Sequence, residues 1–141
     1  MGMTGLKSLD QSLVKTKEWL KDVQQELHYE DEQEAYVAAR AVLHALRDRL
    51  TVEEAADLAA QLPVILTGVY YENWKPANKP LKIRDEAGFF EQVAGELPQN
   101  RQYDSGRITK GFFKALQKHI SGGQLEEIKN SFPGEMRGIF G

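Results

Sequence analysis

A chain of 141 residues has the length of one domain, and its 41% hydrophobic and 28% charged residues are typical of a soluble globular protein. It contains no cysteine, which excludes disulfide bonds, thiolate zinc sites and a cysteine nucleophile together. Residues 1–70 carry 7 Lys/Arg against 12 Asp/Glu, and residues 71–141 carry 11 against 9, which together give the net charge of −3. These opposite signs favour either docking of the two halves or attraction of a partner to one end. The longest uncharged stretch, residues 58–71, falls short of the ~20 apolar residues of a membrane span, and the N-terminus lacks a signal-peptide core. We therefore expect a cytoplasmic protein.

The first predicted helix covers residues 8–28. Apolar residues and one threonine recur in it at three- and four-residue spacing, which builds one buried stripe: Leu9, Leu13, Thr16, Leu20, Val23 and Leu27. Its counterpart in the second half, residues 85–97, is several turns shorter. The leading part, residues 6–13, is therefore expected to lie across the other half or to supply a dimer contact.

Cap residues and prolines divide the rest of the first half into further helices. Asp31 predicts the start of the second helix, and Thr51 with Glu54 predicts a capping box at the start of the third. Pro63 ends one helix and opens the next, because it lacks an N–H and clashes with the preceding turn. Residues 75–84 contain two prolines and are predicted to be a linker.

Residues 110–141 repeat residues 40–71 without a gap, at an offset of seventy positions. Apolar residues, caps, prolines and glycines all coincide: Leu46 with Leu116, Leu50 with Ile120, Thr51 with Ser121, Leu58 with Ile128, Leu62 with Phe132, Pro63 with Pro133, Gly68 with Gly138 and Tyr70 with Phe140. We predict an all-α protein, a tandem duplication of a three- to four-helix unit packed as one bundle-like domain. Residues 1–74 would form the first repeat and residues 85–141 the second.

The run EAYVAARAVLHALRDRLTVEEAADLAAQLPVILTGVYYENWKP, followed by FFEQVAGEL, resembles the prokaryotic domain-of-unknown-function family 2267. Members of that family carry a similar pattern and then a weaker second copy. This chain departs from the pattern at Thr67, where the family has a basic residue, and in its glycine-rich second half. The resemblance implies an all-helical tandem fold in bacteria and implies no activity.

No motif for catalysis or metal binding appears in the chain. His28, His44 and His119 are dispersed, without a second ligand at the spacing of a zinc helix. Ser121 lies close to His119 in sequence but is predicted to cap a helix, and no nucleophile elbow or phosphate-binding loop is present. We therefore predict no catalytic residue, no metal site and no cofactor.

A basic stripe is predicted on one helix face in the second half, formed by Arg107, Lys110, Lys114 and Lys118. A Ser-Gly-Gly turn and another helix follow, which is the outline of a helix-turn-helix. The helix after the turn carries Glu126 and Glu127, whose charges would repel phosphate. Weak nucleic-acid binding is therefore the alternative prediction.

The leading prediction is a non-enzymatic protein–protein interaction module that binds a protein partner or a second copy of itself. Tyr70 falls on the predicted buried face of its helix, whereas Tyr71 and Trp74 come after it in the chain and off that face. Lys75 follows them. They either seal the joint between the halves or anchor a partner, as exposed aromatic residues often do. The predicted partner-binding residues are Tyr71, Trp74 and Lys75, with the extended first helix as the other binding surface. The sequence gives no indication of a small-molecule ligand.

Overall fold

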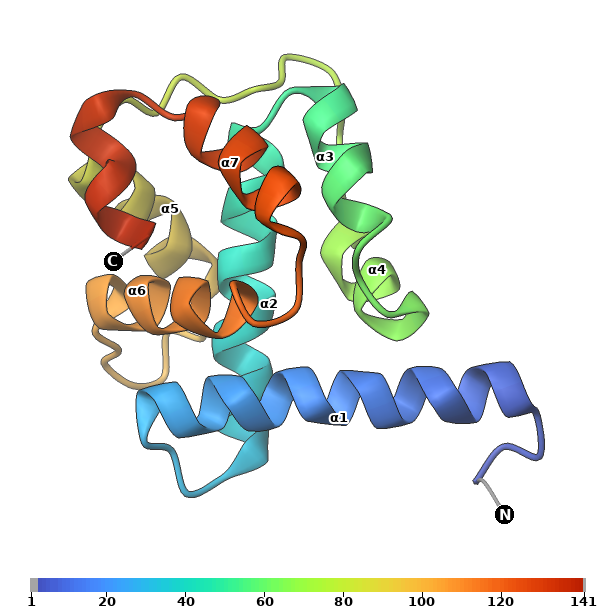
Figure 1. Ribbon diagram of the computed structural model, residues 1–141. Helices are drawn as coiled ribbons and strands as arrows, with labels where there is room; N and C mark the ends of the chain where they lie inside the picture. Colours follow the sequence, from blue (N-terminus) through green and yellow to red (C-terminus); the bar gives the residue numbers. More distant parts are fainter. Residues whose placement is uncertain (1–2, 141) are drawn as a thin grey trace.

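The computed structural model describes residues 3–140, which form seven α-helices and one 3-10 helix and contain no strand (Figure 1). The prediction of an all-α fold is confirmed; the outermost residues of the two predicted repeats, 1–2 and 141, lie outside this range. In chain order the elements are α1 (Lys7–Leu27), α2 (Glu32–Arg49), α3 (Val52–Ala59), α4 (Val64–Tyr71), α5 (Glu86–Glu96), α6 (Ser105–Leu116), α7 (Gly122–Asn130) and the 3-10 helix η1 (Gly134–Phe140).

Side-chain caps start the helices where the sequence predicts them. Asp31 accepts a hydrogen bond from Gln33 N at 2.9 Å, and Thr51 and Glu54 form the complete capping box of α3. At α7 only half of the corresponding box forms, since Ser121 Oγ accepts from Gln124 N at 3.1 Å. Ser121 N donates instead to Gln61 Oε1 at 3.1 Å, which links the start of α7 to the end of α3.

These helices pack around α2 into one compact domain (Figure 1). Buried residues lie on almost every side of α2, which contacts α1, α3, α4, α5 and α6. Between the halves, α1 packs on α6, α5 packs on α2, and α3 lies beside α7. Leu46 in α2 and Leu116 in α6 are both fully buried in the shared core.

The N-terminal part of α1 runs past α4 and away from α5 and α6 (Figure 1). Ser12 Oγ accepts a hydrogen bond from Ile65 N at 3.2 Å, so this part of α1 is held by the first half itself. The expectation that it lies across the second half is wrong. The reason is that α4 already occupies the buried side of this part of the helix.

Helices α1 and α6 pack tightly at Gly111. A Cβ atom on this residue would lie 2.5 Å from Leu27 Cδ2, and Leu27 is fully buried. Gly111→Ala is therefore expected to lower the free energy of unfolding by about 1–3 kcal/mol, because the core must shift to admit one methyl group. Urea unfolding measures the loss.

Gly68→Ala is the matched control for this substitution. Gly68 lies inside α4 with open space around its Cα, so alanine there is expected to stabilise the protein by about 0.5–1 kcal/mol. If both variants changed the free energy of unfolding in the same direction, the close contact with Leu27 would not explain the effect of Gly111→Ala.

Candidate interaction surfaces and the buried polar network

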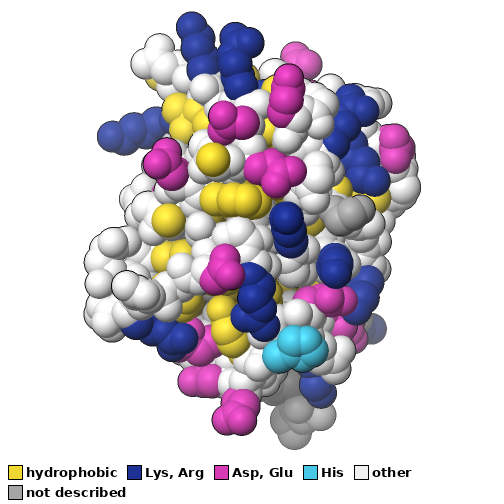
Figure 2. Space-filling view, turned by 90° about the vertical axis from the view of Figure 1, so that its left-hand side faces the viewer, with side chains coloured by type: hydrophobic (Ala, Val, Ile, Leu, Met, Phe, Trp, Pro, Cys, Tyr) yellow, Lys and Arg dark blue, Asp and Glu magenta, His cyan; other side chains and the backbone are white. Residues whose placement is uncertain are grey.

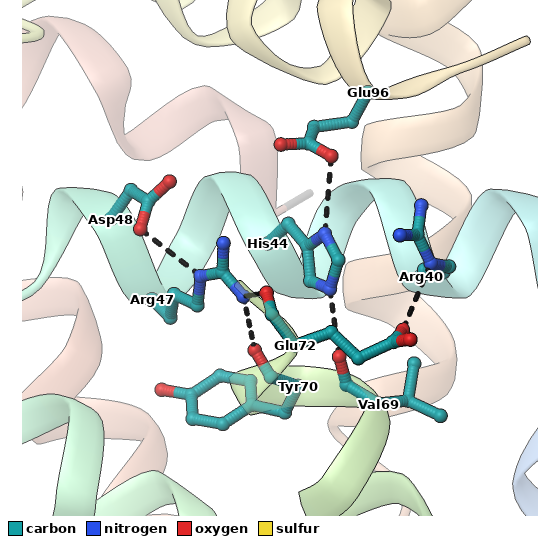
Figure 3. A network of polar contacts seen from close by, with 8 residues as sticks. All are labelled: Arg40, His44, Arg47, Asp48, Val69, Tyr70, Glu72 and Glu96. Carbon is teal, nitrogen blue, oxygen red and sulfur yellow. Dashed lines mark hydrogen bonds and ion pairs between the residues drawn. The ribbon is translucent and has the colours of Figure 1, made fainter. Parts of the chain in front are cut away.

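A buried polar network ties α2 to the C-terminal end of α4 (Figure 3). Arg47, only 4% exposed, donates from Nη1 to Tyr70 O at 2.7 Å and to Glu72 O at 2.5 Å, and from Nε to Asp48 Oδ1 at 3.0 Å. The last carbonyls of a helix have no partner within the helix, so this guanidinium satisfies groups that would otherwise be buried unpaired. The network therefore fixes the end of α4 against α2.

His44 extends the network to the second half of the chain. The residue is 1% exposed; Nε2 lies 2.7 Å from Val69 O, and Nδ1 lies 3.1 Å from Glu96 Oε2 on α5 (Figure 3). A carbonyl only accepts, so the contact with Val69 O places a hydrogen on Nε2. Both ring nitrogens are thus engaged in contacts that join α2 to α4 and α5.

The predicted aromatic residues come together at the same end of α4. The Tyr71 ring lies 5.0 Å from the rings of both Tyr70 and Trp74. Tyr71 and Trp74 are half-buried and pack against the core, whereas Lys75 is exposed. Trp74 Nε1 is buried, and no acceptor in residues 3–140 reaches it. The two rings that were predicted either to seal the joint or to anchor a partner thus turn much of their surface inward.

Tyr70 makes this end of the molecule sensitive to alkali. Burial raises the pKa of its hydroxyl far above the usual value, and the hydroxyl donates to Ala55 O at 3.0 Å. The unfolded chain releases this proton near pH 10, so above that pH the folded protein holds more protons than the unfolded one. The contribution of Tyr70 to the free energy of unfolding is therefore fully present below about pH 10. It is lost as the pH rises further, by up to about 1.4 kcal/mol per pH unit.

Tyr70→Phe is expected to cost about 1 kcal/mol at pH 7, because it removes one hydrogen bond. The variant should also lose stability less steeply than the wild type between pH 10 and 11, a difference that urea unfolding at each pH measures. Equal slopes for the two proteins would show that Tyr70 does not control the alkaline loss.

Exposed apolar side chains gather on the N-terminal part of α1 and on the residues just before it. We call the set Met3, Leu6, Leu9, Leu13 and Val14 the α1 outer face. Of these, Met3, Leu6 and Val14 are more than half exposed, Leu9 is 38% exposed and Leu13 is half-buried. Met3, Leu13 and Val14 line a groove of about 610 Å³ that Lys17 and Lys21 continue along the helix. Val64, 69% exposed, begins the neighbouring α4.

The predicted basic stripe lies on α6, next to the C-terminal end of α1. Two of its side chains are occupied there: Arg107 donates to Leu27 O, and Lys118 lies 3.4 Å from Glu26 Oε1. Lys110 and Lys114 are exposed and line a hollow that also contains Glu26, His28 and Asp104. Figure 2 shows acidic side chains among the basic ones over this side of the molecule. Sequence spacing predicted the stripe but could not show that Glu26, which belongs to α1, lies beside it.

His119, like His44, makes contacts with a neighbouring helix. Nε2 lies 2.6 Å from Asp22 Oδ2, and the ring stacks on Trp19 with the centroids 4.6 Å apart. Within residues 3–140, no three His, Asp or Glu side chains are grouped as metal ligands would be. None of the helices in this range is both long and apolar enough to span a membrane.

These features define a compact all-helical protein with a polar network in its core and an apolar face on its longest helix. The model of the family of uncharacterised conserved proteins DUF2267 matches residues 16–139, nearly the whole chain, and the protein belongs to that family. The resemblance found in the sequence is thereby confirmed. No protein of curated function matches the chain. The α1 outer face, residues 3–14, precedes the stretch that the family model matches.

Proposed function

We propose that this protein is a non-enzymatic protein-interaction module and that the α1 outer face is its binding surface. One observation carries the proposal. Six large apolar side chains are exposed in residues 3–140, and five of them lie on or before α1 or at the start of the adjacent α4, with Val52 as the sixth. Single exposed apolar residues are ordinary, whereas a gathered set marks an interaction site.

We also propose that the scaffold arose by duplication, with two halves related by an approximate two-fold axis. The packing supports this: exchanging α1 with α5, α2 with α6 and α3 with α7 turns the α1–α6 contact into the α5–α2 contact and leaves the α3–α7 contact unchanged. One hydrogen bond recurs at the offset of seventy, since Arg47 donates to Tyr70 O and Gln117 Nε2 donates to Phe140 O at 2.8 Å.

Comparison of the two halves of the proposed duplication supports a binding role for the α1 outer face. Helix α1 has 21 residues and α5, its counterpart, has 11, so the N-terminal part of α1 has no equivalent in the second half. The core does not need this extra length, because its buried stripe starts at Ser12. A binding role explains both why the helix is longer and why its added residues are apolar and exposed.

Site-specific photo-crosslinking in cells that make the protein tests the proposal. A crosslinking amino acid at Leu6 or Val14 is expected to form adducts with protein, and one at Val52, also exposed and apolar, is the matched control. A probe at Lys75 tests the second candidate surface, which Tyr71, Trp74 and Lys75 would form. Adducts from Lys75 alone would move the binding surface there, and adducts no stronger than those at Val52 from every position would reject the module.

Nucleic-acid binding through Lys110 and Lys114 is the weaker proposal, because acidic groups share their hollow. In a filter-binding titration at low salt we expect no affinity that the Lys110→Glu, Lys114→Glu double variant abolishes. Binding that this variant removes would favour the nucleic-acid interpretation instead.

A further inference from the structure

We infer that the partner on the α1 outer face is a second copy of the same chain, whose α1 lies antiparallel to the first. The inference rests on the proposed function and adds the identity of the partner and the geometry of the contact. It comes from the pattern of charged and apolar side chains along α1, considered together with the position of that helix in the fold.

The outer side of α1 carries a seam of alternating three- and four-residue spacing. Within the helix the seam consists of Asp10, Leu13 and Lys17, and Leu6 at the N-cap position precedes it at the same spacing. This is the spacing with which one helix presents a continuous strip to another helix. The residues of the seam are exposed or half-buried, so the strip is open to a partner.

Asp10 and Lys17 lie at equal distances on either side of the Leu13–Val14 pair. When two copies of α1 cross antiparallel on a two-fold axis between residues 13 and 14, Leu13 faces Val14 of the second copy. Asp10 then faces Lys17 of the second copy, and the same ion pair forms again on the other side of the axis. A two-fold contact requires a surface that is complementary to itself. The strip meets this requirement, because its acidic and basic residues exchange places across the axis. A parallel pairing would place Asp10 beside Asp10, where the charges repel.

Both charged groups are available for a further contact. Asp10 accepts hydrogen bonds from Thr4 N at 2.9 Å and from Thr4 Oγ1 at 2.7 Å, and both reach only its Oδ1 atom. Lys17 Nζ lies 2.6 Å from Glu32 Oε2, yet the lysine side chain is 65% exposed. Since an ammonium group carries three donors, Lys17 can contact Glu32 and Asp10 of the second copy together.

The fold leaves room for the second helix. The N-terminal part of α1 projects past α4 at the edge of the bundle (Figure 1), and the groove of about 610 Å³ beside Leu13 and Val14 can receive apolar side chains from the other copy. A helix of 21 residues is about 30 Å long, so the contact covers on the order of 500 Å² per copy. A standard interface covers about 800 Å² per partner. The dimer is therefore weak, with a dissociation constant of micromolar order or above.

Sedimentation velocity of the full chain between about 5 and 300 µM tests the inference. The wild type is expected to shift from monomer to dimer over this range. Asp10→Lys alone and Lys17→Asp alone should each dimerise about tenfold more weakly, because each homodimer then contains two repelling pairs. An equimolar mixture of the two variants should recover the wild-type affinity. In that heterodimer one copy carries lysine at both positions and the other carries aspartate at both, so the two contacts across the axis are attractive again.

Two further variants locate the contact. Val14→Asp should abolish the dimer, and Val52→Asp, at an exposed valine away from α1, should leave it intact. Circular dichroism of every variant confirms that the helices remain folded.

Three results would overturn the inference: a wild type that stays monomeric at 300 µM, a dimer that neither charge reversal changes, or a mixture that fails to recover affinity. Monomeric protein that sediments with phosphatidylserine-containing vesicles would identify a lipid surface as the occupant instead. If the protein stays monomeric while crosslinks from Leu6 reach a different protein, the inference fails and the interaction module stands. If the protein stays monomeric and neither Leu6 nor Val14 forms crosslinks, both the dimer and the interaction module are rejected.

Discussion

Arg47→Ala is expected to lower the free energy of unfolding by about 3–5 kcal/mol, the usual cost of breaking a buried ion pair. The substitution leaves the Asp48 carboxylate, 7% exposed, without its cation, and it leaves the carbonyls of Tyr70 and Glu72 without their donor. The end of α4 should then detach from α2. Equilibrium unfolding in urea measures the loss, and hydrogen exchange should locate it in residues 66–74.

Gln117→Ala is the matched control, because Gln117 lies seventy positions after Arg47 and also donates to a backbone carbonyl. It makes one hydrogen bond there, to Phe140 O, without a buried charge, so its loss should cost only about 1 kcal/mol. The double variant Arg47→Ala, Asp48→Ala should be less destabilised than the sum of its two single variants, since no unpaired charge is left behind once both are gone. An Arg47→Ala variant within 1 kcal/mol of wild type would show that the network does not hold α4.

Leu46→Ala and Leu116→Ala should each cost about 2–5 kcal/mol. Both side chains are fully buried, one in α2 and one in α6, and both belong to one core. Because the halves share that core, each variant should unfold in a single transition that includes the whole chain. Separate transitions for the two halves, or a Leu116→Ala variant as stable as wild type, would contradict the shared core.

The sequence predicted well those features that depend on neighbours in the chain. The capping box at Thr51 needs only Glu54, three residues away, and the buried stripe of α1 follows from helical spacing between Thr16 and Leu27. The prediction that Leu9 and Leu13 belong to that stripe is wrong, since Leu9 is exposed and Leu13 is half-buried. The surplus length of the first helix was also predictable, since its counterpart is visibly shorter. These are local patterns, and physical rules for single helices suffice to interpret them.

The polar network was not predictable, because its contacts join residues far apart in the chain. His44 and Glu96 are separated by 52 positions, and Arg47 bonds to backbone carbonyls, which every residue possesses. The half-formed box at Ser121 has a similar cause: its N–H finds Gln61, sixty positions earlier. Glu26, the acidic partner of Lys118 in the basic stripe, was not predictable for the same reason, since it lies on α1. Such contacts appear only once the helices are packed.

A two-dimensional amide spectrum of the full chain, recorded from about 20 µM to 1 mM, tests most directly the claim that two copies of the protein bind each other through the α1 outer face. We expect concentration-dependent shifts confined to residues 3–24 and the start of α4, with the amides of α5, α6 and η1 unchanged. Shifts centred on Tyr71, Trp74 and Lys75, or a spectrum that stays the same at every concentration, would contradict it.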